Sequence, residues 1–255
     1  MSETTSDRVL GVLSLFAGDR PEWSIEDAAE ALEMPVSTAY RYFRSLTKSG
    51  LLIPHLPGRY VLGPAIIQLD RQLQRHDPFI TAARAEMARL AEEVGDTVIL
   101  LARLYRHQVM CVHREHSGSL EIGEGYQRGK PMPLDRGAAS KVILANLPPR
   151  TVRALSAPDR DGAALLSMTD ALRAELRQIR AQGYSITRGD IEPGIRGFSV
   201  PVFGQGEVLE GSLSVVLPDT RPDHRSVVDR LIQARKAVEA NLALNAMSGL
   251  ADSPR

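Results

Sequence analysis

The sequence predicts an α+β protein with two domains. Three short helices and two short strands are expected within the first 63 residues, whereas the remainder combines longer antiparallel strands with helices grouped beside them. The length of 255 residues suits two domains, because single domains usually run to about 100–200 residues. Hydrophobic residues make up 43% of the chain and charged residues 24%, a balance that excludes a largely disordered protein.

The first 63 residues predict three helices followed by a β-hairpin. Apolar residues at helical spacing indicate a first helix near 6–17, and Ser24 is expected to cap a second one. Pro35 cannot continue that second helix, so a third helix is expected over 38–49. Two short β segments then flank a Pro-Gly turn. This order of elements is typical of a winged helix-turn-helix domain.

A change of pattern separates the two predicted domains. After the second short strand we expect a helix with Ile66, Leu69 and Leu73 on its apolar side, which is also a candidate dimer seam. A His-Asp-Pro sequence then breaks the helical pattern. We therefore expect a winged helix-turn-helix domain over 1–63, a linker helix over 64–76 and a second domain over 77–250.

The second predicted domain is built on antiparallel strands. A long helix over 78–94 precedes three strands that are expected to form a meander. A further helix is expected to begin at residue 135 and to end at 145, before two prolines. The strands are expected over 97–104, 108–114, 119–123, 184–188, 198–203 and 208–217.

The net charge of the chain hides a local asymmetry. Its 31 basic and 31 acidic residues cancel, which taken alone argues against a nucleic-acid partner. Residues 1–33, however, hold eight acidic and two basic residues, a net of −6, and residues 34–69 hold four basic and no acidic residues, a net of +4. Because charges beyond about 10 Å are largely screened at 0.1 M salt, DNA responds to the nearby face. The acid-free stretch covers the third helix and the hairpin, and it favours double-stranded DNA as a partner.

The polar side of the third helix supplies the candidate DNA-binding residues. Arg41 and Arg44 are the candidates for base contacts, because a guanidinium group can bond O6 and N7 of guanine in the major groove. A second group is expected to contact phosphates: Ser37, Thr38, Tyr40, Lys48 and Arg59. The same three-helix fold also serves in protein–protein contacts, so that alternative stays open.

Reactive side chains do not converge in a pattern typical of an enzyme. Cys111, His113 and His116 are the most suggestive metal-ligating set, but no further cysteine or acidic ligand follows at a metal-site spacing. Two pairs of closely spaced glycines, Gly123-x-Gly125 and Gly204-x-Gly206, lack the strand and helix context of a nucleotide-binding loop. The G-x-S-x-G sequence of a nucleophile elbow is absent. We expect no catalytic residue, no metal and no cofactor.

Two further features concern the compartment. Cys111 is the only cysteine, which excludes an internal disulfide and favours a reducing cytoplasm. The N-terminus lacks the pattern of a signal peptide, and no run of 18 apolar residues is present. A cytoplasmic protein without a membrane partner is expected.

Three parts of the chain resemble the IclR family of bacterial transcription regulators, in the order in which that family has them. The first part comprises DRVLGVLSLF, SIEDAAEALEMPVSTAYRYFRSLTKSGLL and PGRYVLGPAIIQL, which resemble the family's DNA-binding domain. The others are PMPLDRGAASKVILANL and LRQIRAQGYSITRGDIEPGIRGFSVPVF. Asp135, Arg136 and Ser140 depart from the residues that are usual in the family, which are His, Ala and Gly.

The resemblance implies that the second domain is a GAF-like (PAS-like) effector-binding domain. In this family the effector is often a small carboxylate, which backbone N–H groups over 137–139 and hydroxyl groups could bind. Arg136 is a further candidate partner for a carboxylate. For Met132, Ile195 and Val216, which are among the candidates, packing in the core is an equal alternative to ligand binding. The candidate effector-binding residues are Glu124, Met132, Arg136, Ala138, Ala139, Thr187, Ile195, Gly197, Ser214 and Val216.

These observations lead to one main functional hypothesis. The protein is expected to be a ligand-responsive transcription regulator, and a repressor rather than an activator. It is expected to bind a palindromic operator as a dimer or, as the family often does, as a dimer of dimers. One alternative is a small-molecule-binding enzyme whose helix-turn-helix domain serves in protein interaction. Another is a ligand-binding protein without a DNA function.

Overall fold

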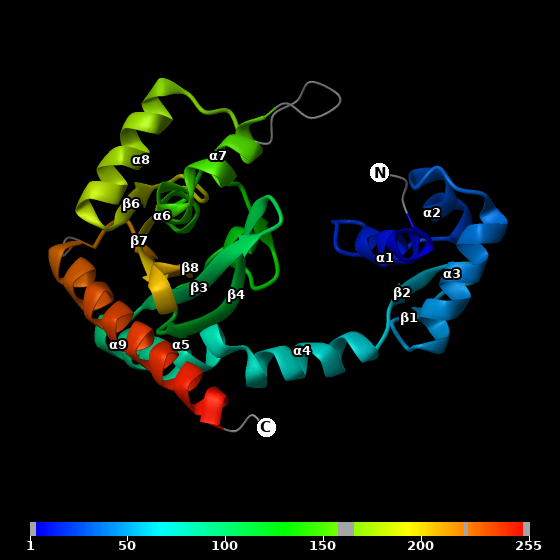
Figure 1. Ribbon diagram of the computed structural model, residues 1–255, viewed down its shortest axis with the longest axis horizontal. Helices are drawn as coiled ribbons and strands as arrows, with labels where there is room; N and C mark the ends of the chain where they lie inside the picture. Colours follow the sequence, from blue (N-terminus) through cyan, green and yellow to red (C-terminus); the bar gives the residue numbers. More distant parts are fainter. Residues whose placement is uncertain (1–3, 158–165, 222–223, 252–255) are drawn as a thin grey trace. The chain divides into compact units, whose positions relative to one another are not determined.

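The computed structural model describes residues 4–157, 166–221 and 224–251 (Figure 1). The chain forms two compact units, Met1–Arg75 and His76–Arg255. Along the described part of the chain, no helix combines the length and apolar character needed to cross a membrane.

Three helices, a hairpin and all but the last residue of a fourth helix form the first unit. Its elements are α1 (Thr5–Leu15), α2 (Ile25–Ala31), α3 (Val36–Lys48), β1 (Leu52–Pro54), β2 (Tyr60–Leu62) and α4 (Ala65–His76). Side chains of Thr4 and Ser24 accept hydrogen bonds from the first turns of α1 and α2 and so begin these helices. The core is closed by aromatic packing, with the rings of Phe43 and Tyr60 at 4.9 Å in an edge arrangement.

A close backbone approach fixes where the hairpin ends. Gly63 donates its N–H to the carbonyl oxygen of Leu51, at 2.8 Å. A Cβ atom at position 63 would lie 2.1 Å from the carbonyl oxygen of Gly50, so only glycine fits there. The hairpin is therefore held against the end of α3.

The second unit is built around one six-stranded antiparallel sheet. Its strand order is β5-β4-β3-β8-β7-β6. The strands are β3 (Thr97–Tyr105), β4 (Gln108–Ser117), β5 (Pro131–Met132), β6 (Ser185–Arg188), β7 (Ile195–Phe203) and β8 (Leu209–Pro218). The helices are α5 (Pro78–Val94), α6 (Ala138–Asn146), α7 (Pro149–Ser156), α8 (Asp170–Gln182) and α9 (His224–Ala251), with single 3-10 turns at Glu124–Tyr126 and Gln205–Glu207.

Helices cover both faces of this sheet, and each face has its own core. Side chains such as Ile99 and Leu101 point from β3 into the core beneath α5 and α9. Val98 and Leu100 alternate with them and point into the opposite core, beneath α6 and α8. An α+β fold with a helix-turn-helix domain and an antiparallel-sheet domain is therefore confirmed.

The structure corrects two details of the second unit. Residues 119–123 form no strand, although their alternation predicted one, because they have no neighbouring strand with which to pair among the described residues. Instead β4 continues to Ser117, and the short β5 occupies the edge of the sheet. The helix expected from residue 135 begins only at Ala138, because Gly137 has a φ of +82° that a helix cannot contain.

Candidate functional site

One candidate site is the outward face of α3 in the first unit. Its buried side packs Ala39, Tyr42, Phe43 and Leu46 into the core, and the helix contains no acidic residue. The opposite side exposes Ser37, Tyr40, Arg41, Arg44 and Lys48, with Thr38 half-buried beside them. Among the described residues, no carboxylate forms an ion pair with the cations of α3, so their charge is available to a partner.

The remaining candidate, Arg59, already has an intramolecular partner. Its Nη1 donates to Oδ2 of Asp27 in α2 at 2.8 Å, and Arg20 donates to the same carboxylate. Burial opposes ionisation of Asp27, but hydrogen bonds from Arg20 and Ser24 and the charges of both arginines outweigh it and lower the pKa of this carboxyl. Arg59 thus holds the wing, which is the hairpin of β1 and β2, against α2. Unlike the cations of α3, it is engaged in an ion pair within the protein.

A second candidate site is a cavity between the sheet and the beginning of α6. It brings together six of the predicted effector residues, Met132, Ala138, Ala139, Gly197, Ser214 and Val216, with Leu100, Tyr126, Gly137, Ser140 and Ile191. The lining residues are buried except for the half-buried Ile191, and the free volume is about 10 Å³, roughly the space that one water molecule needs.

The other four predicted effector residues do not line this cavity. Thr187 is buried and pairs with Gly197 on the neighbouring strand, and its Oγ1 would lie 3.4 Å from a Cβ atom at Gly197, beside the lining. Ile195 belongs to the apolar core. Arg136 is exposed, and Glu124, whose side chain is 78% exposed, lies 3.5 Å from the Nζ of Lys130.

Residues 189–194 form a loop whose Ile191 lines the cavity, and we call this loop the lid segment. Its Ile191 fits against two glycines, because a Cβ atom would lie 2.6 Å from its side chain at Gly125 and 2.9 Å from it at Gly137. Glu192 Oε2 accepts a hydrogen bond from the N–H of Gly123 at 2.8 Å. Ile191 was not predicted from the sequence. Gly125 and Gly137, which leave room for its side chain, were the signal that could have indicated it.

Lys141 joins the lid segment to two helices. Its Nζ lies 2.8 Å from Oδ2 of Asp190 in the lid segment and 2.9 Å from Oε1 of Glu175 in α8. Burial favours the neutral amine, but the hydrogen bonds and charges of both carboxylates outweigh it and raise the pKa of Lys141. Asp190 also accepts the N–H of Gly137 at 3.3 Å, so the start of α6 and the lid segment share one carboxylate.

The lining of the cavity offers hydrogen-bond donors rather than charges. Ser140 Oγ is buried and has no hydrogen-bond partner among the described residues. The first N–H groups of α6 point out of the helix without intrahelical partners. Burial and the nearby carboxylates of Glu192 and Asp190 raise the pKa of Tyr126, whose hydroxyl therefore remains protonated at neutral pH. This set suits a small ligand with oxygen acceptors.

The cysteine and histidine cluster has a structural explanation. Cys111 is buried and donates through Sγ to the carbonyl oxygen of His113 at 3.3 Å, and burial raises the pKa of its thiol to about 11. His113 Nε2 lies 2.8 Å from Glu115, and burial lowers the pKa of the imidazole. Within the described ranges, no three or more His, Cys, Asp or Glu side chains gather where they could hold a metal ion.

Comparison with protein families identifies both units. Residues 5–53 match the IclR helix-turn-helix domain, and residues 71–241 match the C-terminal domain of the bacterial transcriptional regulator IclR. The chain is 26% identical over 219 residues to the HTH-type transcriptional regulator KdgR of Escherichia coli, covering 84% of this chain and 82% of KdgR. It is 28% identical over 220 residues to the HTH-type transcriptional regulator TtgV of Pseudomonas putida, covering 85% and 83% of the two chains.

Solved structures show the same fold. An IclR transcriptional regulator from Alicyclobacillus acidocaldarius superposes with a TM-score of 0.75 at 24% identity, covering 96% of this chain and 99% of that one. An IclR homologue from Microbacterium hydrocarbonoxydans, solved in complex with 4-hydroxybenzoate, gives a TM-score of 0.75 at 25% identity, covering 94% and 99%. The matched domains and relatives are those of transcriptional regulators and not of enzymes. The chain therefore belongs to the IclR family of bacterial transcriptional regulators.

Proposed function

We propose that this regulator is a cytoplasmic repressor that binds a palindromic operator as a dimer, or as a dimer of dimers, and is switched by a small organic effector. The observation that carries the DNA-binding part is the exposed, acid-free face of α3. A helix of this kind fits the major groove of B-DNA, where side chains reach the base edges.

The residues of α3 divide by the contact that each can make. Arg41 and Arg44 are long, exposed and three residues apart, and so reach neighbouring base edges from one helix face. Ser37, Thr38, Tyr40 and Lys48 are assigned to phosphates, which orient the helix without reading sequence. Arg59 is assigned to a phosphate beside the wing through the N–H groups that its ion pair with Asp27 leaves over.

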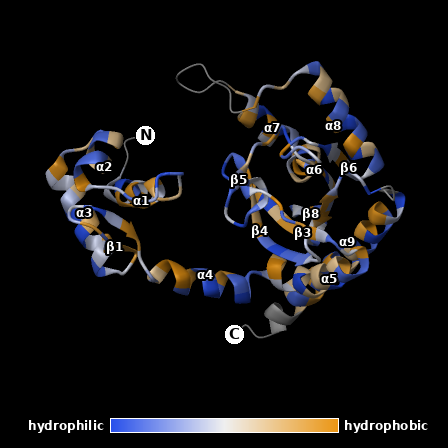
Figure 2. Cartoon of the chain, turned by 180° about the vertical axis from the view of Figure 1, so that it is seen from behind, coloured by the Kyte–Doolittle hydropathy of each residue, from blue (hydrophilic) through white to orange (hydrophobic). Residues whose placement is uncertain are grey.

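Dimerisation is supported by the surface of α4 (Figure 2). This helix has no buried residue within the described chain. Of the predicted seam, Leu69 and Leu73 are exposed and Ile66 is half-buried, whereas the neighbouring Ile67 is exposed. Twelve-residue helices are marginal in water without tertiary packing. A second copy packed along α4 covers these side chains and places two α3 helices on two half-sites of a palindrome.

The effector is assigned to the cavity beneath the lid segment. The buried, unpartnered Ser140 Oγ and the N-terminal N–H groups of α6 can bind the carboxylate of a small organic acid. 4-Hydroxybenzoate, which the Microbacterium homologue binds, has this chemistry. Because Arg136 is exposed, we assign the carboxylate of the ligand to the uncharged hydrogen-bond donors of the cavity rather than to this arginine.

Footprinting of the DNA upstream of the protein's own gene tests the DNA-binding assignment. We expect salt-sensitive protection of two half-sites of a palindrome, separated by about one or two helical turns. Absence of protection at any palindrome at low salt would overturn the proposal.

A thermal-shift screen of small organic acids tests the effector assignment. A ligand that binds only the folded state raises the melting temperature by mass action. We expect a shift with a hydroxybenzoate or a related small acid, and a weaker shift in Ser140→Ala, which lacks the cavity hydroxyl. Exposed Ser45→Ala is the matched control, and equal shifts in both variants would remove the ligand from this cavity.

A further inference from the structure

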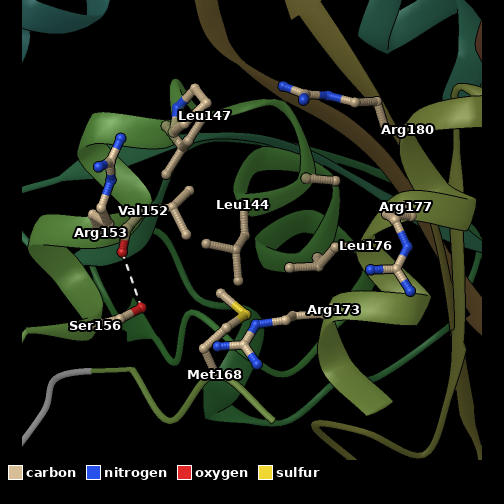
Figure 3. A pocket seen from close by; sticks show the side chains of 12 residues that line it. Leu144, Leu147, Val152, Arg153, Ser156, Met168, Arg173, Leu176, Arg177 and Arg180 are labelled. Atoms are coloured by element: carbon tan, nitrogen blue, oxygen red, sulfur yellow. Dashed lines mark hydrogen bonds between the residues drawn. The ribbon is translucent and has the colours of Figure 1, made fainter. Parts of the chain in front are cut away.

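A second hollow in the C-terminal unit lies between α7 and α8, on the outer side of α6 (Figure 3). Its volume is about 420 Å³, within the range of roughly 300–1,000 Å³ that is common for small-molecule sites. Its described lining residues all differ from those of the cavity beneath the lid segment. The two hollows are therefore separate sites.

The lining of this hollow combines an apolar floor with a cationic rim. Figure 3 shows Leu144 and Leu176 between Arg153 on one side and Arg177 and Arg180 on the other. None of the described residues that line the hollow is acidic. The apolar part comprises Leu144, Ala145, Leu147, Pro149, Val152, Met168 and Leu176, and the cationic part comprises Arg153, Arg173, Arg177 and Arg180.

The fold makes little use of these four arginines. Arg173 pairs with Asp170 at 2.9 Å, but both side chains are more than half exposed, and such pairs contribute little to stability. Within the ranges that the structure describes, no acidic side chain forms an ion pair with the other three. Arg173, Arg177 and Arg180 are four and three residues apart on one face of α8, where like charges repel. This repulsion between the arginines of α8 destabilises the folded protein, and a bound anion would relieve it.

We propose that this hollow binds an amphipathic organic anion, with a compact apolar body on the floor and a carboxylate, sulfonate or phosphate at the rim. The apolar floor binds the body of the ligand by excluding water. A guanidinium group presents paired N–H donors that match a carboxylate or sulfonate. The site is independent of the effector cavity and of operator binding.

A purely structural explanation makes a different prediction. Arginine stems often lie along apolar surface while their charged ends stay in water. In that case the floor would bind neutral and anionic apolar molecules equally well. A pair of probes that differ only in charge separates the two explanations.

The test uses the full chain and the fluorescent probe 8-anilinonaphthalene-1-sulfonate, with N-phenyl-1-naphthylamine as its counterpart without the sulfonate. We expect one sulfonate probe per chain, and at least about tenfold weaker binding in Arg177→Gln/Arg180→Gln, because each charged hydrogen bond is worth about a factor of ten. The neutral probe should bind more weakly and be indifferent to this variant. Arg150→Gln/Arg225→Gln removes the same charge from exposed positions outside the hollow and should bind as the parent does.

A second variant tests the floor while keeping all four arginines. Met168→Trp fills the hollow and should abolish binding of the sulfonate probe, with circular dichroism confirming that the variants are folded. Unchanged affinity in Arg177→Gln/Arg180→Gln overturns the proposal, as does equally tight binding of the neutral probe. Loss of the probe in Gly197→Val alone would locate it in the lid-segment cavity and would also overturn the proposal.

Discussion

Helices α3 and α8 have the same length and a similar row of cations, yet their surroundings differ. Each has thirteen residues, with Arg41, Arg44 and Lys48 on one and three arginines of similar spacing on the other. The cations of α3 project from an exposed face without acidic residues. Those of α8 border a hollow with an apolar floor. A row of cations on a helix therefore does not specify its ligand: a bare polar face suits a polyanion, and an adjoining apolar hollow suits a small amphipathic anion.

The largest expected effect distinguishes the two rows by their DNA contacts. Arg41→Ala/Arg44→Ala should weaken operator binding by about 100-fold or more, because each base contact contributes roughly 1–3 kcal/mol. Arg177→Ala/Arg180→Ala removes the same charge from α8 and should change the affinity by less than about twofold. Fluorescence anisotropy on the footprinted operator measures both, and equal decreases in affinity would mean that overall charge, not α3, binds the DNA.

The next effect concerns how α8 is held in place. Lys141→Gln leaves two carboxylates without their cation and should lower the free energy of unfolding at pH 7 by about 2 kcal/mol, less than for a fully buried pair because Glu175 is 40% exposed. Since the pKa of Lys141 is raised in the folded state, its stabilisation is complete below the ordinary value of 10.5 and disappears as the pH rises through the folded pKa.

Two spectroscopic probes locate this decrease in stability. The single tryptophan, Trp23, lies in the first unit, so its fluorescence reports that unit, while far-UV circular dichroism reports the whole chain. Lys141→Gln should shift the urea midpoint by circular dichroism and leave the Trp23 transition in place. Exposed Lys236→Gln is the matched control. A shift of the Trp23 transition would contradict independent stabilisation of the two units.

A smaller effect separates phosphate binding from base recognition. Lys48→Gln removes one cation from a phosphate, so it should weaken binding uniformly across DNA sequences and reduce the slope of log K against log salt by about 1. Arg173→Gln in α8 should leave the slope unchanged. A titration between about 50 and 200 mM salt measures the slope. A decrease in affinity confined to one operator sequence would instead assign Lys48 to a base.

The smallest expected effect concerns Arg59, which lies in the acid-free stretch of residues 34–69 and forms an ion pair with Asp27. Asp27→Asn removes that partner and should lower the melting temperature slightly at pH 7, because exposed ion pairs contribute little. The pKa of Asp27 is lowered in the folded protein, so its stabilisation is present above the ordinary value of 3.8 and disappears as the pH falls through the folded pKa. Melting curves from pH 7 to pH 2 should therefore converge for parent and variant, and a constant difference would contradict the ion-pair explanation.

The DNA-binding residues of α3 can be predicted from the sequence, whereas much of the lining of the two hollows cannot, and the reasons are physical. Arg41 and Arg44 follow from helical periodicity, because the buried side of a helix determines its exposed side. Tyr126 and Ile191 lie in a 3-10 turn and a loop whose course depends on contacts such as Glu192 with Gly123, which leave no period in the sequence. The segment 119–123 has the alternation of a strand, but pairing needs a neighbour that alternation cannot supply. The arginine-rimmed hollow joins α7 to α8, and no spacing rule relates residues so far apart.

The small volume of the cavity beneath the lid segment has a kinetic consequence. With room for about one water molecule, it can hold the proposed organic effector only after part of its lining has moved, and Ile191 of the lid segment is the half-buried member of that lining. Entry is then a two-step process in which opening precedes contact. In stopped-flow mixing, the observed rate should rise with ligand concentration and then level off at the opening rate of the lid segment. The contacts that hold the lid segment, among them the ion pair between Lys141 and Asp190, would then limit the speed of the response, and the ligand would determine how long the cavity stays occupied.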